Sequence, residues 1–315
     1  RCFEFNNTLA AFLNQHFPDY VYWLEFVQRK RFRKIILRGV PVNLAGPLKE
    51  QVFDKIDRMV LTSATLTTQG AFDFIKERIG CETKEELVLD SPFDYTSQAL
   101  LYVPTDMPDP AEKMEIYVQK ISERCRELIH ATGGKTFILF TSYAVLNRVY
   151  EQLEDLGRVY PLLRQGDLPT AQMIERFKEH PSVIFGTSSF WQGVDIPGEA
   201  LTSVIITKLP FDAPKEPVTE ARLEDLKKRS IDPFRNYQIP RAIIQLKQGF
   251  GRLIRKQTDT GVVSILDSRV VNRGYGKKFL ASLPPCPVVE DLEEVSRFLS
   301  RWPQTATEAK NLSMG

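Results

Sequence analysis

The chain has 315 residues, enough for one large or two ordinary domains, and its 43% hydrophobic and 26% charged residues are typical of a globular protein with a substantial core. A formal net charge of +2 argues against binding of nucleic acid by bulk positive charge, but not against a groove with locally placed donors. The four cysteines are far apart and no run of about 18 apolar residues occurs, so the sequence predicts a reduced, cytoplasmic protein without a metal site or a membrane span.

The first eighty residues predict a small α/β segment. A helix is expected over 6–17, and two apolar runs, 20–26 and 35–44, flank a basic turn and could pair as strands. Residues 58–80 predict an apolar strand that ends in Ser and Thr, followed by a helix closed by a glycine. Because the chain begins in a helical pattern without an initiator Met, we interpret it as a piece of a longer protein.

The rest of the chain alternates strands and helices. This order predicts an α/β fold with a mainly parallel sheet covered by helices on both faces. The expected strands lie at 99–104, 136–142, 158–164, 182–188, 201–210 and 261–267, and the last dozen residues are expected to be loosely ordered. Ligands of such sheets gather at the carboxyl ends of the strands.

One stretch imitates a phosphate-binding P-loop. Residues 133–136 read Gly-Gly-Lys-Thr, but the first glycine of the P-loop pattern falls on Ile129, inside a predicted helix. The order is also helix, glycines, strand, the reverse of a P-loop. We therefore interpret Gly133 and Gly134 as the end of a helix, where glycine tolerates positive φ, and expect no Walker A motif. No Asp-Glu pair after an apolar strand stands out as a Walker B motif either.

Four other stretches place polar residues where strands or helices end. They are LTSATL (61–66), LFTSYAVL (139–146), FGTSSFWQGVDIPG (185–198) and QGFGRLIR (248–255). Hydroxyl side chains beside helix-start amides can bind phosphates of a nucleic-acid backbone without an excess of basic residues. The candidates are Thr141, Ser142, Thr187 and Ser188, although Ser142 could simply cap a helix.

Arg252 and Arg255 are spaced three residues apart near the end of a predicted long helix. On one helix face, both could reach a γ-phosphate and stabilise charge during phosphoryl transfer, provided that another domain supplies the P-loop. The alternative is a solvated cationic helix end, which the helix dipole favours. Asp195 follows Gly193 on a tight loop, a position suited to coupling nucleotide and strand contacts.

Together these stretches resemble the DinG/XPD branch of superfamily 2 helicases. TSATL resembles motif III, LFTSY motif IV and GTSSFWQGVDIPG motif V, and QGFGRLIR matches the motif VI pattern Q-x-x-G-R-x-x-R. DSPFDY and DSR, at 90–95 and 267–269, resemble the bacterial DinG side of the branch. Motif V departs from many relatives in having Gln192 where they have Glu.

The resemblance implies half of a two-domain motor. Members of the branch have two RecA-like domains, hydrolyse ATP between them and move 5′ to 3′ along single-stranded DNA. It implies that residues 1–70 return from an arch insertion and the first motor domain and end in motif III. It further implies that 71–295 form the RecA-like second motor domain and 296–315 a C-terminal tail.

The resemblance also implies roles for single residues. Arg252 and Arg255 would be arginine fingers, and Gln248 and Asp195 would relay the nucleotide state. Of the aromatic residues Tyr143, Phe190 and Trp191, each could stack on a base or pack in the core. The expected set is nucleotide-binding Gln248, Gly251, Gly193 and Asp195; DNA-binding Thr141, Ser142, Tyr143, Thr187, Ser188 and Trp191; and coupling Ser63 and Thr65.

Cofactors and partners follow from the same resemblance. The full-length protein is expected to use ATP and Mg, while this chain alone, without Walker A and B, is expected to bind neither tightly and to be inactive. An iron–sulfur cluster, where relatives have one, would be encoded upstream. The expected partners are single-stranded DNA and the protein's own N-terminal motor domain.

Three rival functions remain open at this point. The chain could belong to a DNA-binding or regulatory module without chemistry, or to a DinG-like nuclease in which helicase domains only deliver DNA. It could also be an unrelated α/β enzyme with Cys125 as nucleophile, but Cys125 lies within a helical pattern with no His nearby.

Overall fold

The structure is a computed structural model that describes residues 2–28, 33–83, 85–191, 200–213 and 215–301. These residues form two compact units, which we call the hairpin unit (1–87 and 211–241) and the sheet unit (88–210 and 242–315). This division differs from the expected one, because 71–87 and 211–241 group with the first seventy residues. Helix α10 begins in the hairpin unit and ends in the sheet unit.

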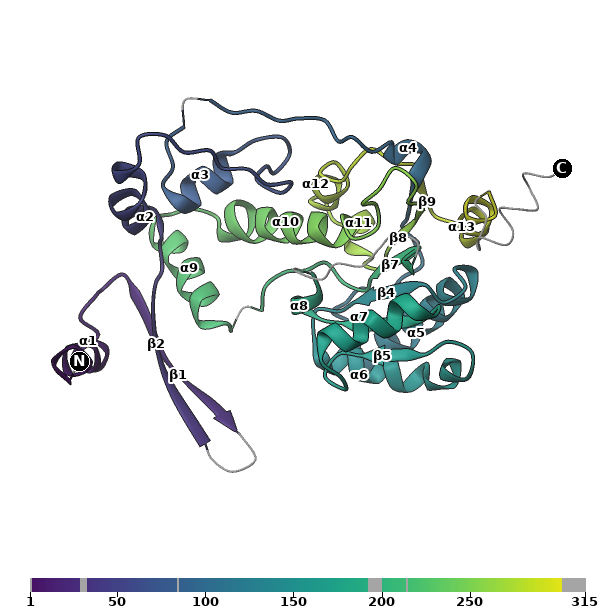
Figure 1. Ribbon diagram of the computed structural model, residues 1–315, viewed down its shortest axis with the longest axis horizontal. Helices are drawn as coiled ribbons and strands as arrows, with labels where there is room; N and C mark the ends of the chain where they lie inside the picture. Colours follow the sequence, from purple (N-terminus) through teal and green to yellow (C-terminus); the bar gives the residue numbers. More distant parts are fainter. Residues whose placement is uncertain (1, 29–32, 84, 192–199, 214, 302–315) are drawn as a thin grey trace. The chain divides into compact units, whose positions relative to one another are not determined.

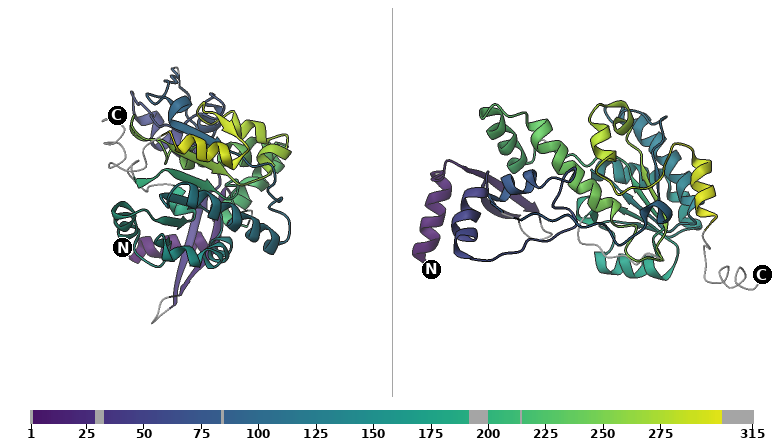
Figure 2. Two further views of the ribbon diagram at one scale, coloured as in Figure 1. Left: turned by 90° about the vertical axis from the view of Figure 1, so that its right-hand side faces the viewer. Right: turned by 90° about the horizontal axis from the view of Figure 1, so that it is seen from above.

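The hairpin unit is built on one antiparallel strand pair (Figures 1 and 2). The predicted pairing around the basic turn is confirmed, with Leu24 opposite Leu37. The edge of Phe12 in the first helix packs on Tyr22, with ring centroids 5.5 Å apart. The elements are α1 (Cys2–Leu13), β1 (Tyr20–Gln28), β2 (Arg33–Pro41), α2 (Ala45–Gln51), a 3-10 helix (Phe53–Lys55), α3 (Asp73–Ile79), α9 (Pro217–Lys228), a π-helix (Phe234–Gln238) and the start of α10 (Ile239–Phe250).

The strand expected at the start of 58–80 is wrong. Residues 58–63 form no strand, and the apolar side chains of Val60 and Leu61 are exposed. An apolar run becomes a strand only when a neighbour satisfies its backbone N–H and C=O groups, and no described segment pairs with this one. The helix expected after it is present as α3 and is closed by Gly80 at φ +68°, as its glycine predicted.

The sheet unit contains a seven-stranded parallel sheet, which confirms the predicted α/β class. The strand order is β5-β6-β4-β7-β8-β3-β9. The strands are β3 (Ala99–Tyr102), β4 (Thr136–Leu139), β5 (Leu162–Arg164), β6 (Val183–Gly186), β7 (Ser203–Ile206), β8 (Gly261–Ile265) and β9 (Val288–Val289). The helices are α4 (Tyr95–Gln98), α5 (Met114–Ala131), α6 (Tyr143–Gln152), α7 (Thr170–Glu179), α8 (Ser188–Trp191), α11 (Arg269–Asn272), α12 (Gly276–Leu280) and α13 (Leu292–Leu299), with a 3-10 helix at Glu154–Arg158.

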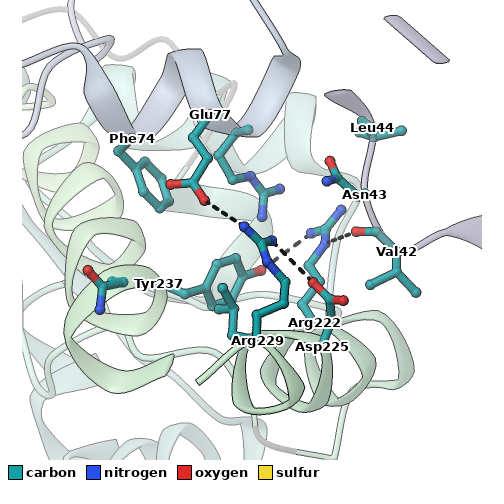
Figure 3. Close-up of a pocket in the computed structure, with 12 residues that line it drawn as sticks. Val42, Asn43, Leu44, Phe74, Glu77, Arg222, Asp225, Arg229 and Tyr237 are labelled. Carbon is teal, nitrogen blue, oxygen red and sulfur yellow. Dashed lines mark hydrogen bonds and ion pairs between the residues drawn. The ribbon is translucent and has the colours of Figure 1, made fainter. Parts of the chain in front are cut away.

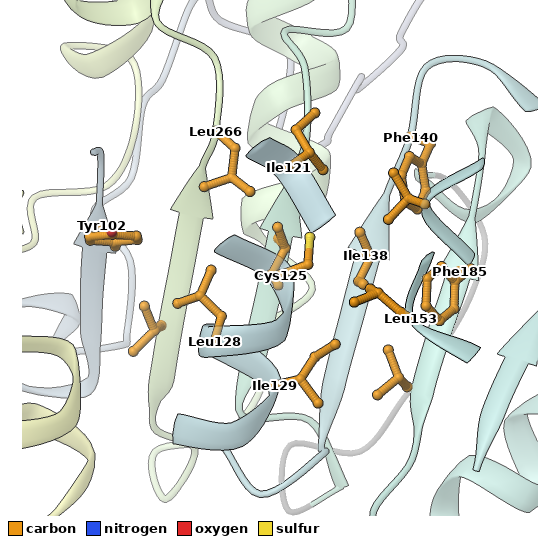
Figure 4. Close-up of a cluster of buried hydrophobic side chains, with 14 of the residues drawn as sticks. Tyr102, Ile121, Cys125, Leu128, Ile129, Ile138, Phe140, Leu153, Phe185 and Leu266 are labelled. Atoms are coloured by element: carbon orange, nitrogen blue, oxygen red, sulfur yellow. The ribbon is translucent and has the colours of Figure 1, made fainter. Parts of the chain in front are cut away.

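Helices cover both faces of this sheet. On one face, α5 turns Ile121, Cys125, Leu128 and Ile129 toward the strands, at the spacing of one helical stripe (Figure 4). Helices α6 and α13 complete this core cluster. The other face is covered by α8 and the end of α10, where the Phe190 ring packs 5.7 Å from that of a β4 phenylalanine.

The apparent P-loop is a helix end, as predicted. Helix α5 stops at Ala131, Gly133 and Gly134 both have positive φ, and β4 then begins at Thr136. The N–H of Gly134 donates to the carbonyl of Ile129 at 3.0 Å, which satisfies a carbonyl in the last turn. The lysine of this stretch therefore leads into a buried strand.

Candidate functional site

The ends of β4 and β6 are level with one another. Leu139, the last residue of β4, lies opposite Gly186, the last residue of β6. Thr141 and Ser142 follow β4 and are exposed. The Ser142 hydroxyl accepts a hydrogen bond from the N–H of Val145 at 3.4 Å and caps α6, so its capping interpretation is confirmed.

A glutamine that the sequence analysis missed joins three strand ends. Gln165 follows β5, and its Nε2 donates to the hydroxyl of Tyr143 at 2.7 Å. Its Oε1 accepts from both the N–H and the hydroxyl of Thr187, at 2.6 and 3.0 Å. One side-chain amide thus links the segments that follow β4, β5 and β6. The only sequence signal for it was a polar residue directly after an apolar strand.

This network changes the roles expected for the hydroxyl residues. Thr187 is 4% exposed and its hydroxyl is engaged by Gln165, so it does not present a free surface to a phosphate. Tyr143 is 51% exposed, with its hydroxyl held in place, and remains available for stacking. Ser188 begins α8, and its side chain lies outside what the structure describes.

Trp191 is a core residue, and the expectation that it stacks on a base needs correction. Its side chain is 0% exposed, and its indole N–H donates to the carbonyl of Phe140 at 3.2 Å. Phe190 is 1% exposed. For both residues the alternative considered from sequence, core packing, describes the structure. Both side chains are buried because α8 packs on the face of the sheet, against β4 and the end of α10.

The backbone of Trp191 also holds the first candidate arginine. Nη2 of Arg252 donates to the Trp191 carbonyl at 2.7 Å. Gly249, in the last turn of α10, makes this approach possible, because a Cβ there would lie 2.9 Å from the indole ring and 3.2 Å from the side chain of Leu139. The Arg252 guanidinium is therefore fixed beside the helix that follows β6.

The expectation that Arg252 and Arg255 share one helix face is wrong. Helix α10 ends at Phe250, and the turn after it carries Arg252. Further on, Oδ2 of Asp259 accepts the N–H groups of Arg255 and Lys256, each at 2.8 Å. Glycines on both sides of Phe250 favour the end of the helix here, since glycine is a poor helix residue.

The loop that carries Arg255 is fastened from a second side. Nε2 of Gln98, a buried residue before β3, donates to the backbone carbonyls of Lys256, Gln257 and Asp259 at 3.1, 3.1 and 2.8 Å. Burial lowers the pKa of the Arg252 guanidinium and, despite the charge of Asp259, that of Arg255 as well. Because an arginine remains protonated in proteins, both residues keep their positive charge.

The remaining candidates are placed as follows. Gln248 lies in the last turn of α10, and its Oε1 is buried without a hydrogen-bond partner among the described residues. Gly251 is exposed after the helix end. Gly193 and Asp195 lie outside the described residues. In the hairpin unit, the Ser63 hydroxyl lies 3.3 Å from that of Thr65 and accepts its N–H at 3.2 Å, which is a local turn.

Three further findings concern Cys125, metal binding and membrane insertion. Cys125 is 0% exposed within α5, and burial raises the pKa of its thiol, so it is not placed to act as a nucleophile. Among the described side chains, no group of three His, Cys, Asp or Glu residues is arranged to hold a metal ion. None of the described helices has the length and apolar character needed to cross a membrane.

We expect Gly249→Ala to destabilise the sheet unit by about 1–3 kcal/mol, because the new methyl group must displace Trp191 or Leu139. Denaturant unfolding followed by tryptophan fluorescence measures the change. Gly274→Ala is the matched control, since nothing lies within 4 Å of its added Cβ. Equal stability of the two variants would contradict the close packing.

Known proteins are similar to this chain in sequence and in fold. The Helicase C-terminal domain family matches residues 125–286. The ATP-dependent DNA helicase YoaA of Escherichia coli is 40% identical over 90% of this chain and 44% of its own length. The ATP-dependent helicase DinG of Mycobacterium tuberculosis is 37% identical over 84% of this chain and 40% of its own length. The chain thus spans less than half the length of these curated relatives.

A relative with another activity and a solved structure complete the comparison. The 3′-5′ exonuclease DinG of Bacillus subtilis is 31% identical over 86% of this chain and 30% of its own length. A solved XPD helicase is 16% identical, with a TM-score of 0.64 over 90% of this chain and 50% of that chain, which supports the RecA-like fold. This chain belongs to the helicase C-terminal domain family, and the curated relatives that it resembles in sequence are YoaA and DinG helicases.

Proposed function

We propose that the chain supplies arginine fingers and single-stranded DNA contacts to an ATP-dependent 5′-3′ DNA helicase that acts in the cytoplasm in DNA repair or replication. The observation that carries this proposal is the position of Arg252. Its guanidinium binds the carbonyl of Trp191 at the end of α8, and the residue before α8, Thr187, binds Gln165. The candidate phosphate contact and the candidate strand contacts therefore meet on one four-residue helix.

The residues on the nucleotide side fit a phosphate group. Arg252 and Arg255 keep their charge while partly buried, and a charge in such surroundings interacts more strongly with an anion than it does in water. The buried, unsatisfied Oε1 of Gln248 can accept a hydrogen bond from a nucleotide or from a neighbouring domain. ATP with Mg would be held by a first motor domain and would supply the phosphoryl group. Gly193, Asp195 and Gly251 are proposed to complete this side.

The proposed contacts with single-stranded DNA are made by exposed groups. Thr141 and the Ser142 hydroxyl, together with the N–H groups of the first turn of α6 that Ser142 does not cap, are proposed to contact backbone phosphates. Tyr143 offers a ring for stacking, and Gln165 fixes its hydroxyl. Thr187 acts by orienting Gln165. Ser63 and Thr65 are proposed to couple the two motor domains.

Arg252→Ala in the full-length protein tests the arginine-finger role. We expect ATP turnover to fall about 10³-fold or more, because an arginine finger contributes at least that much to phosphoryl transfer. ATP binding, measured with a fluorescent analogue, should stay nearly unchanged. Lys256→Ala is the control, since it removes an exposed positive charge from the same loop. Retained turnover in Arg252→Ala would remove the assignment.

Gln165→Leu tests the strand contacts. The substitution removes three hydrogen bonds that hold Tyr143 and Thr187, so we expect the affinity for a labelled single-stranded oligonucleotide to fall about tenfold. Fluorescence anisotropy measures it. Gln152→Leu, an exposed amide at the end of α6, is the matched control. If both variants bind like the unmodified protein, Gln165 has no part in DNA binding.

A second candidate function is favoured by one observation, the exonuclease name of the Bacillus subtilis relative. In that case the chain would deliver DNA to a nuclease domain and unwind little or none. Assays on the full-length protein separate the two: ATP-driven unwinding supports the helicase, whereas metal-dependent degradation without unwinding supports the delivery module.

A further inference from the structure

A pocket of ≈ 60 Å³ in the hairpin unit is lined by three arginines (Figure 3). Helix α3 contributes Arg78, and α9 with the residue after it contributes Arg222 and Arg229. Two carboxylates, Glu77 and Asp225, also line it, so the lining carries one excess positive charge.

Both carboxylates form ion pairs with the same arginine, Arg229. Arg229 lies 3.7 Å from Glu77 and 3.5 Å from Asp225, and its side chain is 47% exposed. Figure 3 shows Arg229 reaching between these two acidic residues. Such an exposed pair contributes little to stability, but it neutralises the charge of Arg229 locally.

The other two arginines have no carboxylate within 4.0 Å among the described residues. Nε of Arg222 donates to the carbonyl of Val42 at 3.0 Å, and Nη1 donates to the hydroxyl of Tyr237 at 3.3 Å (Figure 3). The Arg78 guanidinium lies 5.1 Å from the centroid of the Tyr237 ring and 6.0 Å from that of Phe74. Both groups are thus held in place by neutral partners.

Holding two like charges together in a half-buried site has a cost. Burial lowers the pKa of Arg78, and the positive charge of Arg222 lowers it further. The backbone at Arg78 is nevertheless held in place, because Gly80, two residues later, closes α3 and packs against α2. There a Cβ would lie 2.5 Å from the carbonyl oxygen of Ala45, so only glycine allows α3 to pack so closely on α2.

We propose that Arg78 and Arg222 form an anion site that binds a phosphate group. Planar guanidinium groups suit phosphate oxygens, and an anion between them would relieve their mutual repulsion. The hydrogen bond to the Val42 carbonyl involves Arg222 alone, and Arg78 adds a second positive charge to the same pocket without a carboxylate beside it. The phosphate group belongs either to a single-stranded nucleic acid or to a free phosphate compound.

The test is Arg78→Gln in the full-length protein, with Arg229→Gln as the matched control. Both substitutions remove one positive charge from the same pocket, but only the first removes a guanidinium without a carboxylate partner. Arg78→Gln keeps most of the side-chain stem over Tyr237, and thermal melting without ligand checks that each variant folds.

Two measurements separate the sources. For a nucleic-acid phosphate, Arg78→Gln should weaken oligonucleotide binding about tenfold and reduce the slope of log K against log salt by about 0.7, while Arg229→Gln leaves both unchanged. For a free phosphate compound, oligonucleotide binding is unchanged, but inorganic phosphate raises the melting temperature less in Arg78→Gln than in the control, at matched ionic strength.

The nucleic-acid arm rests on the proposed DNA binding, whereas the phosphate arm does not. If the unmodified protein binds no oligonucleotide, the proposed function fails while the phosphate arm still tests the pocket. A folded Arg78→Gln variant that matches Arg229→Gln in both measurements would overturn the anion site.

Discussion

The contact between Gly249 and Trp191 is the constraint on which the candidate site depends. Because residue 249 has no side chain, α10 approaches closely enough for the Arg252 guanidinium to reach the carbonyl of Trp191. The indole of the same residue binds the carbonyl of Phe140, directly after β4. A buried tryptophan thus ties Arg252 to the segments that follow β4 and β6.

Under the proposed function, α8 would connect the proposed phosphate contact with the proposed strand contacts. Thr187 precedes the helix and binds Gln165, which also holds the exposed ring of Tyr143, while the helix ends at the residue that binds Arg252. The helix is short and its aromatic residues are buried, so we expect packing to pass a shift at one end on to the other.

The sequence predicted the parallel sheet, the helix end that imitates a P-loop and the family, because these follow from periodicity, glycine and motif spacing. It did not predict that 58–63 would lack strand structure, because pairing depends on a distant neighbour. The three-residue spacing of Arg252 and Arg255 predicted that they share a helix face, but α10 ends at Phe250, before either of them. Burial of Trp191 and the hydrogen bonds of Gln165 depend on packing between segments far apart in sequence, which local patterns do not encode.

The most direct test of the connection is the ratio of ATP turnover with and without saturating single-stranded DNA in the full-length protein carrying Gly249→Ala. Tryptophan fluorescence first establishes that the indole environment has changed. The account predicts that the ratio falls toward one although ATP and the oligonucleotide both still bind, because the displaced α8 no longer links their sites. An unchanged ratio in a variant with a displaced Trp191 would contradict it.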